Sequence, residues 1–245
     1  LNTSLTLANL PLMDIRPVIA FKVTEQLSLA AGADVYTFTD IYGRGHAVTQ
    51  FQSSGAPGLP PPGTPLEFNG KDTSVGLNLS LRYTPCLADG NRPWCSFGFQ
   101  YRSQTRLDLD GQFLAAGTAL LNTRTTFVLP QTFTFGVAVW PVLSKDHEWK
   151  VEVDLVKTDW SAFQNTDVHL STGAVIPVPR NWTDTLTVMV GTEYKWIDPA
   201  ALVHWDVKAR AGYLYSTTPV TSQPFDPAVP DSNSHTLSVG MGFLC

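Results

Sequence analysis

The segment LTVMVGTEYKW, residues 186–196, alternates between two kinds of side chain. One set of alternate positions is largely apolar and ends in two aromatic residues: Leu186, Val188, Val190, Thr192, Tyr194 and Trp196. The other set carries the charges: Thr187, Met189, Gly191, Glu193 and Lys195. Because successive side chains of a β-strand point to opposite faces, the segment predicts a strand with one apolar and one charged face.

The same alternation recurs along the chain between turn residues, and it predicts nine strands. They lie near residues 14–23, 27–40, 73–84, 94–109, 124–140, 148–162, 184–196, 204–216 and 235–244. Helical periodicity is almost absent, so we expect an all-β protein. The strands run to both ends of the sequence, and we therefore expect a single domain over residues 1–245.

Composition narrows the class of β protein. Charged residues make up 15% of the 245 residues, against about 25% in a typical soluble domain, while the hydrophobic share is 43%. A formal net charge of −5 argues against a nucleic-acid-binding surface. The sequence has no run of about 18 apolar residues, which excludes a transmembrane helix. A β-sandwich and an outer-membrane β-barrel remain.

The connections between the predicted strands alternate in length. The short ones are 24–26, 85–93, 141–147 and 197–203, and the long ones are 41–72, 110–123, 163–183 and 217–234. An up-and-down barrel has this rhythm, with short periplasmic turns and longer loops outside, whereas a Greek-key sandwich has no reason to keep it. We therefore predict an up-and-down antiparallel transmembrane β-barrel with apolar faces toward lipid and charged faces toward a wet interior.

Aromatic residues near the ends of the predicted strands fit the girdles that such barrels place at the membrane interfaces. They are Trp94, Trp140, Trp149, Tyr194, Trp196, Trp205 and Tyr215. Each of them alone could equally be a core aromatic. Their common position at strand ends favours the girdle.

Several segments, in order along the chain, resemble the FadL/TodX (OmpP1) family of outer-membrane transporters for hydrophobic compounds. They are LPQTFTFGVAV (129–139), DWSAFQ (159–164), RNWTDTLTVMVGTEYKW (180–196), ARAGYLYSTTPV (209–220) and VPDSNSHTLSVGMGF (229–243). The resemblance implies a bacterial outer-membrane barrel of fourteen strands with an N-terminal hatch. The nine predicted strands would be the fourth to the twelfth, so the chain would be a partial barrel without the hatch, the first three strands and the last two.

The resemblance also implies a function, the passive uptake of long-chain fatty acids or of aromatic and aliphatic hydrocarbons. In the family, the substrate binds first in a groove among the long loops, then in an apolar pocket in the lumen, and leaves through an opening in the wall. Expected partners are hydrophobic small molecules, outer-membrane lipid and lipopolysaccharide, and the protein is expected to be a monomer.

Two long loops are unusually apolar for exposed segments, and we expect them to line the capture groove. The candidates are Phe113, Leu114, Leu120 and Leu121 in 110–123, and Phe51 and Phe68 in 41–72. Alternatively, 110–123 is a short helix packed on the neighbouring loop. Arg180 is a candidate for binding a carboxylate head group, with Arg44 second; the alternative for Arg180 is a solvated loop arginine.

Cys86 and Cys95 bracket a predicted turn in the segment TPCLADGNRPWC, residues 84–95. A disulfide could close this turn in an oxidising compartment, and two free thiols are the alternative.

Signatures of catalysis and cofactor binding are missing from the sequence. The histidines His46, His147, His169, His204 and His235 have no metal-ligand spacing, and there is no phosphate-binding loop or nucleophile elbow. We therefore expect no metal, no cofactor and no enzyme activity, and an outer-membrane esterase is disfavoured. Two alternatives stay open: a porin with a polar channel, and a soluble β-sandwich that binds lipid or carbohydrate.

Overall fold

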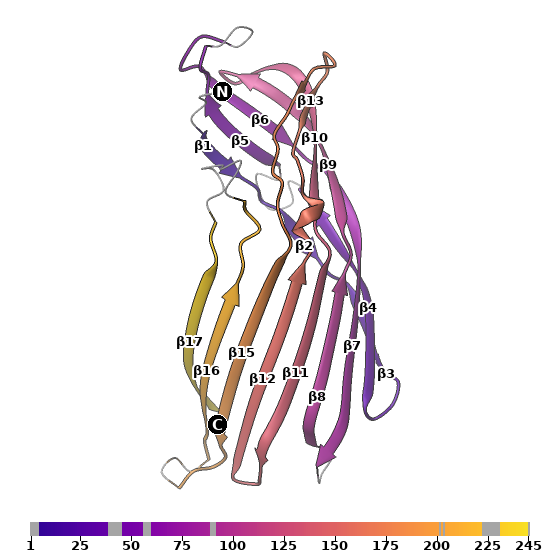
Figure 1. Cartoon of the computed structure of the whole chain (residues 1–245), viewed down its shortest axis with the longest axis vertical. Coiled ribbons are helices and arrows are strands. Elements are labelled where there is room, and N and C mark those ends of the chain that lie inside the picture. The colour runs from indigo at the N-terminus through magenta and orange to yellow at the C-terminus, as the bar shows by residue number, and fades with distance from the viewer. Residues whose placement is uncertain are drawn as a thin grey trace.

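The computed structural model of the chain describes residues 5–38, 46–55, 60–88, 92–200, 202, 204–221 and 231–244. These residues form two antiparallel sheets, a tall wall and a smaller sheet that continues it at one end (Figure 1). We call the smaller one the cap sheet. Among the described residues, no helix has the length and apolar character that crossing a membrane would require.

The wall contains ten strands in up-and-down order. From one edge to the other they are β17 (Ser234–Leu244), β16 (Asp206–Ser216), β15 (Thr185–Trp196), β12 (His147–Thr158), β11 (Thr132–Leu143), β8 (Arg92–Arg102), β7 (Thr73–Ala88) and β4 (Leu27–Thr37), followed by β2 (Met13–Ile15) and β3 (Val18–Lys22), which both pair with β4. Because β2 and β3 share one edge position, the wall has the nine positions that the alternation predicts. The predicted antiparallel barrel wall is confirmed, although it is not closed within this chain.

The edge strand is interrupted between β2 and β3, at Arg16 and Pro17. The Pro17 carbonyl turns toward β4 and accepts a hydrogen bond from the Ala33 amide at 3.2 Å. A Cβ on Gly32 would lie 2.4 Å from that carbonyl oxygen, so the interruption depends on a glycine at this position. The sequence therefore favours a break in the edge strand at Arg16 and Pro17, because Gly32 leaves room for the Pro17 carbonyl.

The cap sheet is built from segments that the sequence analysis assigns mainly to long loops. Its order is β1 (Leu5–Asn9), β5 (Ala47–Gln52), β6 (Pro65–Gly70), β9 (Thr105–Ala115), β10 (Thr118–Leu129), β13 (Val168–Leu170) and β14 (Val175–Ile176). The predicted strands 94–109 and 124–140 each split in two, at residues 103–104 and at 130–131. Their outer halves leave the wall and enter the cap sheet.

Residues 110–123 are the tip of the β9–β10 hairpin, so both the irregular loop and the short helix expected there are wrong. The turn is formed by Ala116 and Gly117, whose φ angles of 47° and 79° are both positive. Two-residue hairpin turns of this kind need positive φ at both positions, because that twist matches the flanking strands. Alternation then continues through β9 to the turn, and in β10 it is interrupted at Leu120.

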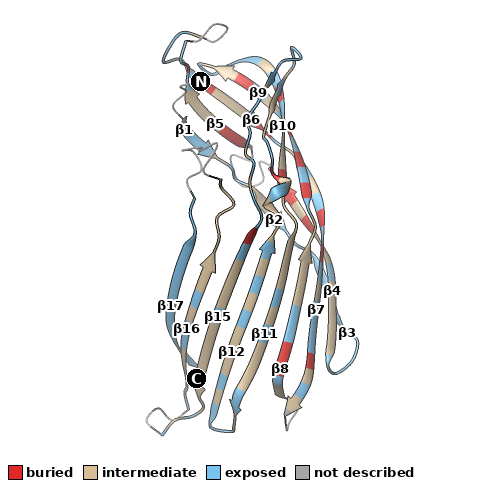
Figure 2. Cartoon of the chain, viewed as in Figure 1, coloured by how far each residue is buried: buried red, intermediate tan, exposed pale blue. Residues whose placement is uncertain are grey.

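The two faces of the wall differ in chemistry as predicted. One face is apolar and exposed; its residues include Val75, Leu77, Leu79 and Leu81 in β7 and Leu237, Val239, Met241 and Phe243 in β17, with Val239 at 90% exposure. In a sandwich this set would be covered by a second sheet. Figure 2 shows that buried residues gather in the cap sheet and near the wall ends, whereas the middle of the wall is tan and blue.

The opposite face of the wall is polar and laced with ion pairs. Arg210 Nε lies 2.6 Å from Glu193, and Lys195 Nζ lies 2.7 Å from Asp206. A hollow of about 440 Å³ on this face is lined by charged and polar side chains, among them Arg82, Lys150, Glu152 and Asp154. The wall thus separates an apolar environment from a wet one.

One predicted girdle residue lies elsewhere. Trp140 lines the polar hollow, together with Lys150 and Glu152. It follows Thr134, Gly136 and Ala138 on the alternate positions of β11 that line the same hollow, so the assignment to a lipid-facing girdle is wrong for Trp140.

A new charged side chain should destabilise the barrel on the apolar face of the wall and should be tolerated on the polar face. Val188→Arg and Val239→Arg place a guanidinium on the apolar face and should destabilise the assembled barrel by about 2–4 kcal/mol, as at a bilayer midplane. Ser238→Arg, beside Val239 but on the polar face, is the matched control and should be milder. The measurement is the fraction of outer-membrane protein that keeps a heat-modifiable, folded gel mobility. Equal loss at all three positions would contradict the assigned faces.

Candidate functional site

The apolar face of the cap sheet brings together side chains from segments far apart in the sequence. Strand pairing aligns Phe51 with Leu66, Phe68 with Phe113, and Phe113 with Leu121. The same face continues along β9 and β10, where Leu107 pairs with Phe127. The residues that form this face are Phe51, Leu66, Phe68, Leu107, Leu109, Phe113, Leu121 and Phe127.

Three phenylalanines form a ladder across β5, β6 and β9. The ring centroids of Phe51 and Phe68 are 5.4 Å apart, and those of Phe68 and Phe113 are 4.9 Å apart. Aromatic pairs at such separations contribute about 0.5–1.5 kcal/mol each beyond the area they bury. Three of the six residues predicted to line a groove are therefore direct neighbours, contributed by both apolar loops.

The six predicted groove residues differ in exposure and in face. Phe113 is only 8% exposed and packs against Phe68, whereas Phe51, Phe68 and Leu121 are half-buried. Leu120 is the extra residue at an irregularity in the β9–β10 pairing and is exposed. Leu114 pairs with Glu67 and Ala119, which places it on the opposite, polar face of the cap sheet. The structure thus brings five of the six to one face or its rim and sets Leu114 apart.

A second aromatic cluster adjoins this face and was not predicted as a site. Phe127 contacts Phe163 at a centroid distance of 5.0 Å, and Phe163 contacts Trp182 at 4.7 Å. Trp160 completes the cluster, 5.0 Å from Trp182. Phe163 is 2% exposed, while both tryptophans are half-buried. The DWSAFQ and RNW segments carry Trp160, Phe163 and Trp182, and that concentration of aromatics at the two ends of the predicted loop 163–183 was the available signal.

The apolar face joins the top of the wall through a compact core. Tyr36 and Phe38 at the end of β4 pack with Ala47, Leu107 and Leu109 of the cap sheet. Leu12, Phe127 and Leu129 pack around them. The far end of the apolar face thus packs at the top of the wall, and Thr49, Gly111 and Thr123 lie on the same face between this core and the Phe51–Phe68–Phe113 ladder.

Arg180 lies beside the second aromatic cluster. Its amide donates to the Gln164 carbonyl at 2.8 Å, and its Nε donates to Thr166 Oγ1 at 3.3 Å. Thr166 is anchored in turn by Thr125 of β10, whose hydroxyl donates to its carbonyl at 3.2 Å. The half-buried Arg180 side chain is thus held against Thr166, and Arg180 precedes Trp182 by two residues in the chain. Arg44, the second head-group candidate, lies outside the described residues.

A buried ion network lies under the core, on the polar face of the wall, and it was not predicted as a site. Arg102 Nε donates to Asp34 at 2.8 Å, and its Nη2 donates to Asp14 at 2.8 Å. Asn78 donates to the other oxygen of Asp34 at 3.0 Å. Asp34 is 1% exposed. Since Arg16 also pairs with Asp14, two cations face two anions, and the network links β2, β4, β7 and β8.

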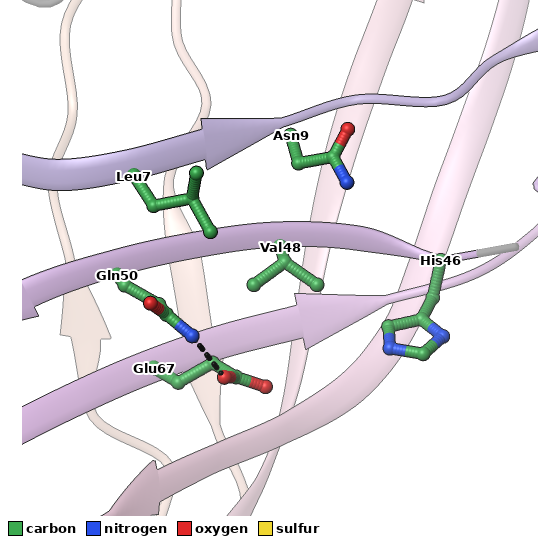
Figure 3. A pocket seen from close by; sticks show the side chains of 6 residues that line it. All are labelled: Leu7, Asn9, His46, Val48, Gln50 and Glu67. Atoms are coloured by element: carbon green, nitrogen blue, oxygen red, sulfur yellow. Dashed lines mark hydrogen bonds between the residues drawn. The ribbon is translucent and has the colours of Figure 1, made fainter. Parts of the chain in front are cut away.

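The polar face of the cap sheet contains a separate hollow of about 330 Å³. Figure 3 shows its lining, with Leu7 and Asn9 from β1, His46, Val48 and Gln50 from the start of β5 and just before it, and Glu67 from β6. Gln50 donates to Glu67 at 2.9 Å across the hollow. Four of its six lining residues carry hydrogen-bonding side chains, and the other two are Leu7 and Val48. Within the described part of the chain, no group of three or more His, Cys, Asp or Glu side chains could hold a metal ion.

Cys86 and Cys95 are opposite one another in the β7–β8 ladder, at the end of the wall away from the cap sheet (Figure 1). Both are free thiols in this structure. The disulfide between them stays a prediction.

The buried network should be far more sensitive to truncation than an exposed pair. Arg102→Ala takes the hydrogen-bonded cation from buried Asp34 and leaves Arg16, 3.7 Å away, so we expect a loss of about 3 kcal/mol in the free energy of unfolding, the lower end for a broken buried pair. Arg124→Ala is the control, because Arg124 and Asp110 pair at 2.8 Å on the surface with 60% and 67% exposure. An exposed pair of this kind contributes about 0–1 kcal/mol. Denaturant unfolding in detergent measures both variants, and similar losses would contradict the role given to Arg102.

Comparison with known proteins supplies an independent line of evidence. The family described as outer membrane protein transport protein (OMPP1/FadL/TodX) matches residues 5–245. The long-chain fatty acid transport protein of Salmonella typhi is 24% identical over 245 residues, which cover 90% of this chain and 53% of that protein. The chain spans about half the length of the curated relatives it matches, or less.

Two solved structures share the fold. A Pseudomonas aeruginosa FadL homologue has a TM-score of 0.71 at 19% identity, covering 94% of this chain and 55% of that one. The Pseudomonas putida toluene transporter TodX has a TM-score of 0.59 at 18% identity, covering 94% of this chain and 60% of that one.

Proposed function

Since the chain belongs to the outer membrane protein transport family (OMPP1/FadL/TodX), we propose that the protein takes up hydrophobic molecules passively across the bacterial outer membrane, where the family is located. The observation that carries the proposal is the apolar face of the cap sheet: its aromatic ladder is half-buried, and its other end packs into the Tyr36–Phe38 core at the top of a wall that is polar on its inner side. No catalytic step is assigned, in keeping with the names of transporter and channel that the relatives carry.

The physical reason for an apolar track is the transfer free energy of the substrate. Burial of apolar area is favourable by about 25 cal/mol per Å², so a hydrocarbon gains on leaving water for a surface of this kind. A water-filled channel offers no such gain. The alternative of a polar-channel porin would leave the contiguous aromatic ladder without a role.

Capture is assigned to the accessible part of the cap-sheet face. Phe51, Phe68 and Leu121 are half-buried and Leu120 is exposed beside them, so together they offer an apolar patch at the tip of the molecule. Phe113 is buried, and its role is to position Phe68, which packs directly on it. We propose that the protein acts as a monomer, with membrane lipid around its wall and lipopolysaccharide near the cap sheet.

Arg180 is proposed to select among substrates. It precedes Trp182 by two residues in the chain, and the proposal is that a ligand stacked on the second aromatic cluster extends its carboxylate to the guanidinium. Relatives named for long-chain fatty acids and for toluene both occur, and this chain shares the fold of the toluene transporter. Long-chain fatty acids and uncharged hydrocarbons are therefore the two substrate classes to compare.

Leu121→Asp tests the capture surface. A carboxylate beside the Phe68–Phe113 pair should lower uptake of both substrate classes about tenfold, which corresponds to a loss of about 1.4 kcal/mol of binding free energy. Leu114→Asp is the matched control on the same hairpin but the other face, and it should leave uptake close to normal. Uptake is measured in cells whose own transporters are deleted, at equal amounts of folded protein. Equal effects of the two variants would remove the cap-sheet face from the pathway.

Arg180→Gln separates the two substrate classes. A hydrogen bond to a charged group contributes about 1.5–3 kcal/mol, so binding of a long-chain fatty acid should weaken by about tenfold to a hundredfold. Binding of toluene should not change, because it has no charge to pair. Competition with a fluorescent fatty acid and direct toluene uptake provide the two measurements. Unchanged fatty-acid binding would show Arg180 to be a solvated loop arginine.

A further inference from the structure

The ends of β7 and β8 that carry Cys86 and Cys95 lie at the end of the wall opposite the cap sheet (Figure 1). In outer-membrane barrels the short turns face the periplasm. The periplasm is an oxidising compartment in which disulfides form and persist. Thiols at this end of the protein are therefore exposed to disulfide-forming chemistry, which thiols of a cytosolic protein are not.

Cys86 and Cys95 have the placement that a disulfide requires. They are direct partners across the β7–β8 ladder. Directly opposed residues of an antiparallel pair have Cβ atoms about 4.5–5.5 Å apart, close to the separation of about 3.5–4.5 Å in a disulfide. The pairing is irregular on both sides of Cys86, and such bulges bend and twist a strand locally, which allows the remaining approach.

The contacts around the turn show what a disulfide would fix in place. Gln26, in the β3–β4 turn, accepts a hydrogen bond from the Thr84 amide at 2.8 Å, and its side chain donates to the Pro85 carbonyl at 3.3 Å. On the other side, Arg92 donates to the Ser144 carbonyl at 3.1 Å and to Glu148 at 3.3 Å, at the β11–β12 turn. The two strand ends that carry the cysteines thus connect three neighbouring turns into a continuous rim.

The two thiols differ in access. Cys86 is exposed, whereas Cys95 is 6% exposed. A bulky protein oxidant can therefore reach the sulfur of Cys86 but not that of Cys95.

We propose that Cys86 and Cys95 form a disulfide that clips the periplasmic rim, with Cys86 as the attacking thiol and Cys95 as the resolving thiol. The Cys86 thiolate attacks the disulfide of a periplasmic dithiol–disulfide oxidase, forms a mixed disulfide and releases one oxidase thiolate. The Cys95 thiolate then attacks the Cys86 sulfur, closes the intramolecular bond and releases the second oxidase thiolate. The two cysteines lose two electrons and two protons, and the oxidase disulfide is reduced to a dithiol.

A single tryptic peptide tests whether the bond forms. Trypsin cleaves after Arg82 and Arg102 but not after Arg92, which precedes Pro93, so both cysteines stay within residues 83–102. In protein isolated from outer membranes without reductant, this peptide should resist alkylation and be about 2 Da lighter than its reduced form, because two hydrogens are lost. Two alkylated thiols in that peptide, or a link from it to another peptide, would overturn the proposal.

Two serine variants test the order of attack. Cys95→Ser keeps the attacking thiol and removes the resolving one, so a mixed disulfide with the oxidase should accumulate. Cys86→Ser leaves only the buried thiol and should accumulate at least tenfold less of it. Both are small, near-isosteric changes, and folded protein is quantified by gel mobility in each sample. Accumulation with Cys86→Ser rather than with Cys95→Ser would overturn the assigned order.

Discussion

The structure depends on one constraint, the pairing of every backbone N–H and C=O group that lies in hydrocarbon. An unpaired group there costs several kcal/mol, and the free energy of unfolding of a whole domain is only about 5–15 kcal/mol. A β-wall meets this demand by hydrogen bonds between strands, and it leaves each strand with one face to lipid and one to water. The alternation of apolar and polar residues in 186–196 reflects these two environments, and it recurs in β7, β12, β16 and β17.

The same alternation has the opposite consequence once the chain leaves the membrane. In β8, Phe97 belongs to the exposed apolar face of the wall. Beyond the break at residues 103–104, Leu107 and Leu109 occupy the same alternate positions but are buried in the core between cap sheet and wall. Apolar side chains that are stable in contact with lipid must be covered in water, and the aromatic ladder and its neighbouring core provide that cover. The proposed capture surface is the part of this face that stays half-covered.

Sequence reasoning was strongest where one environment acts on a whole strand. The wall positions were predictable because lipid and water impose a strict period of two. The β9–β10 hairpin was missed because FLAAGTALL (113–121) reads as an apolar run, and the turn within it, Ala116–Gly117, lacks the Asn or Asp that usually marks one. The short β5 and β6 have too few residues for a clear period.

Phe51, Phe68 and Phe113 were predicted from their residue type. Their contact depends on the β6–β9 pairing, which nothing local in the sequence specifies. The face of Leu114 was readable, since it is adjacent to Phe113 in a strand. The partners of Arg102 were not, because Asp14 and Asp34 come from strands distant in sequence.

The orientation of β15 tests the account most directly. In the intact protein reconstituted into a bilayer, with its native cysteines replaced, single spin labels are placed along residues 186–196. Their accessibility to oxygen, which concentrates in hydrocarbon, and to a polar nickel chelate, which stays in water, is then compared. The account predicts a period of two, with labels at 186, 188 and 190 favouring oxygen and labels at 187, 189 and 191 favouring the chelate. The reverse pattern, or chelate access at every position, would contradict an apolar face turned to lipid and a wet interior.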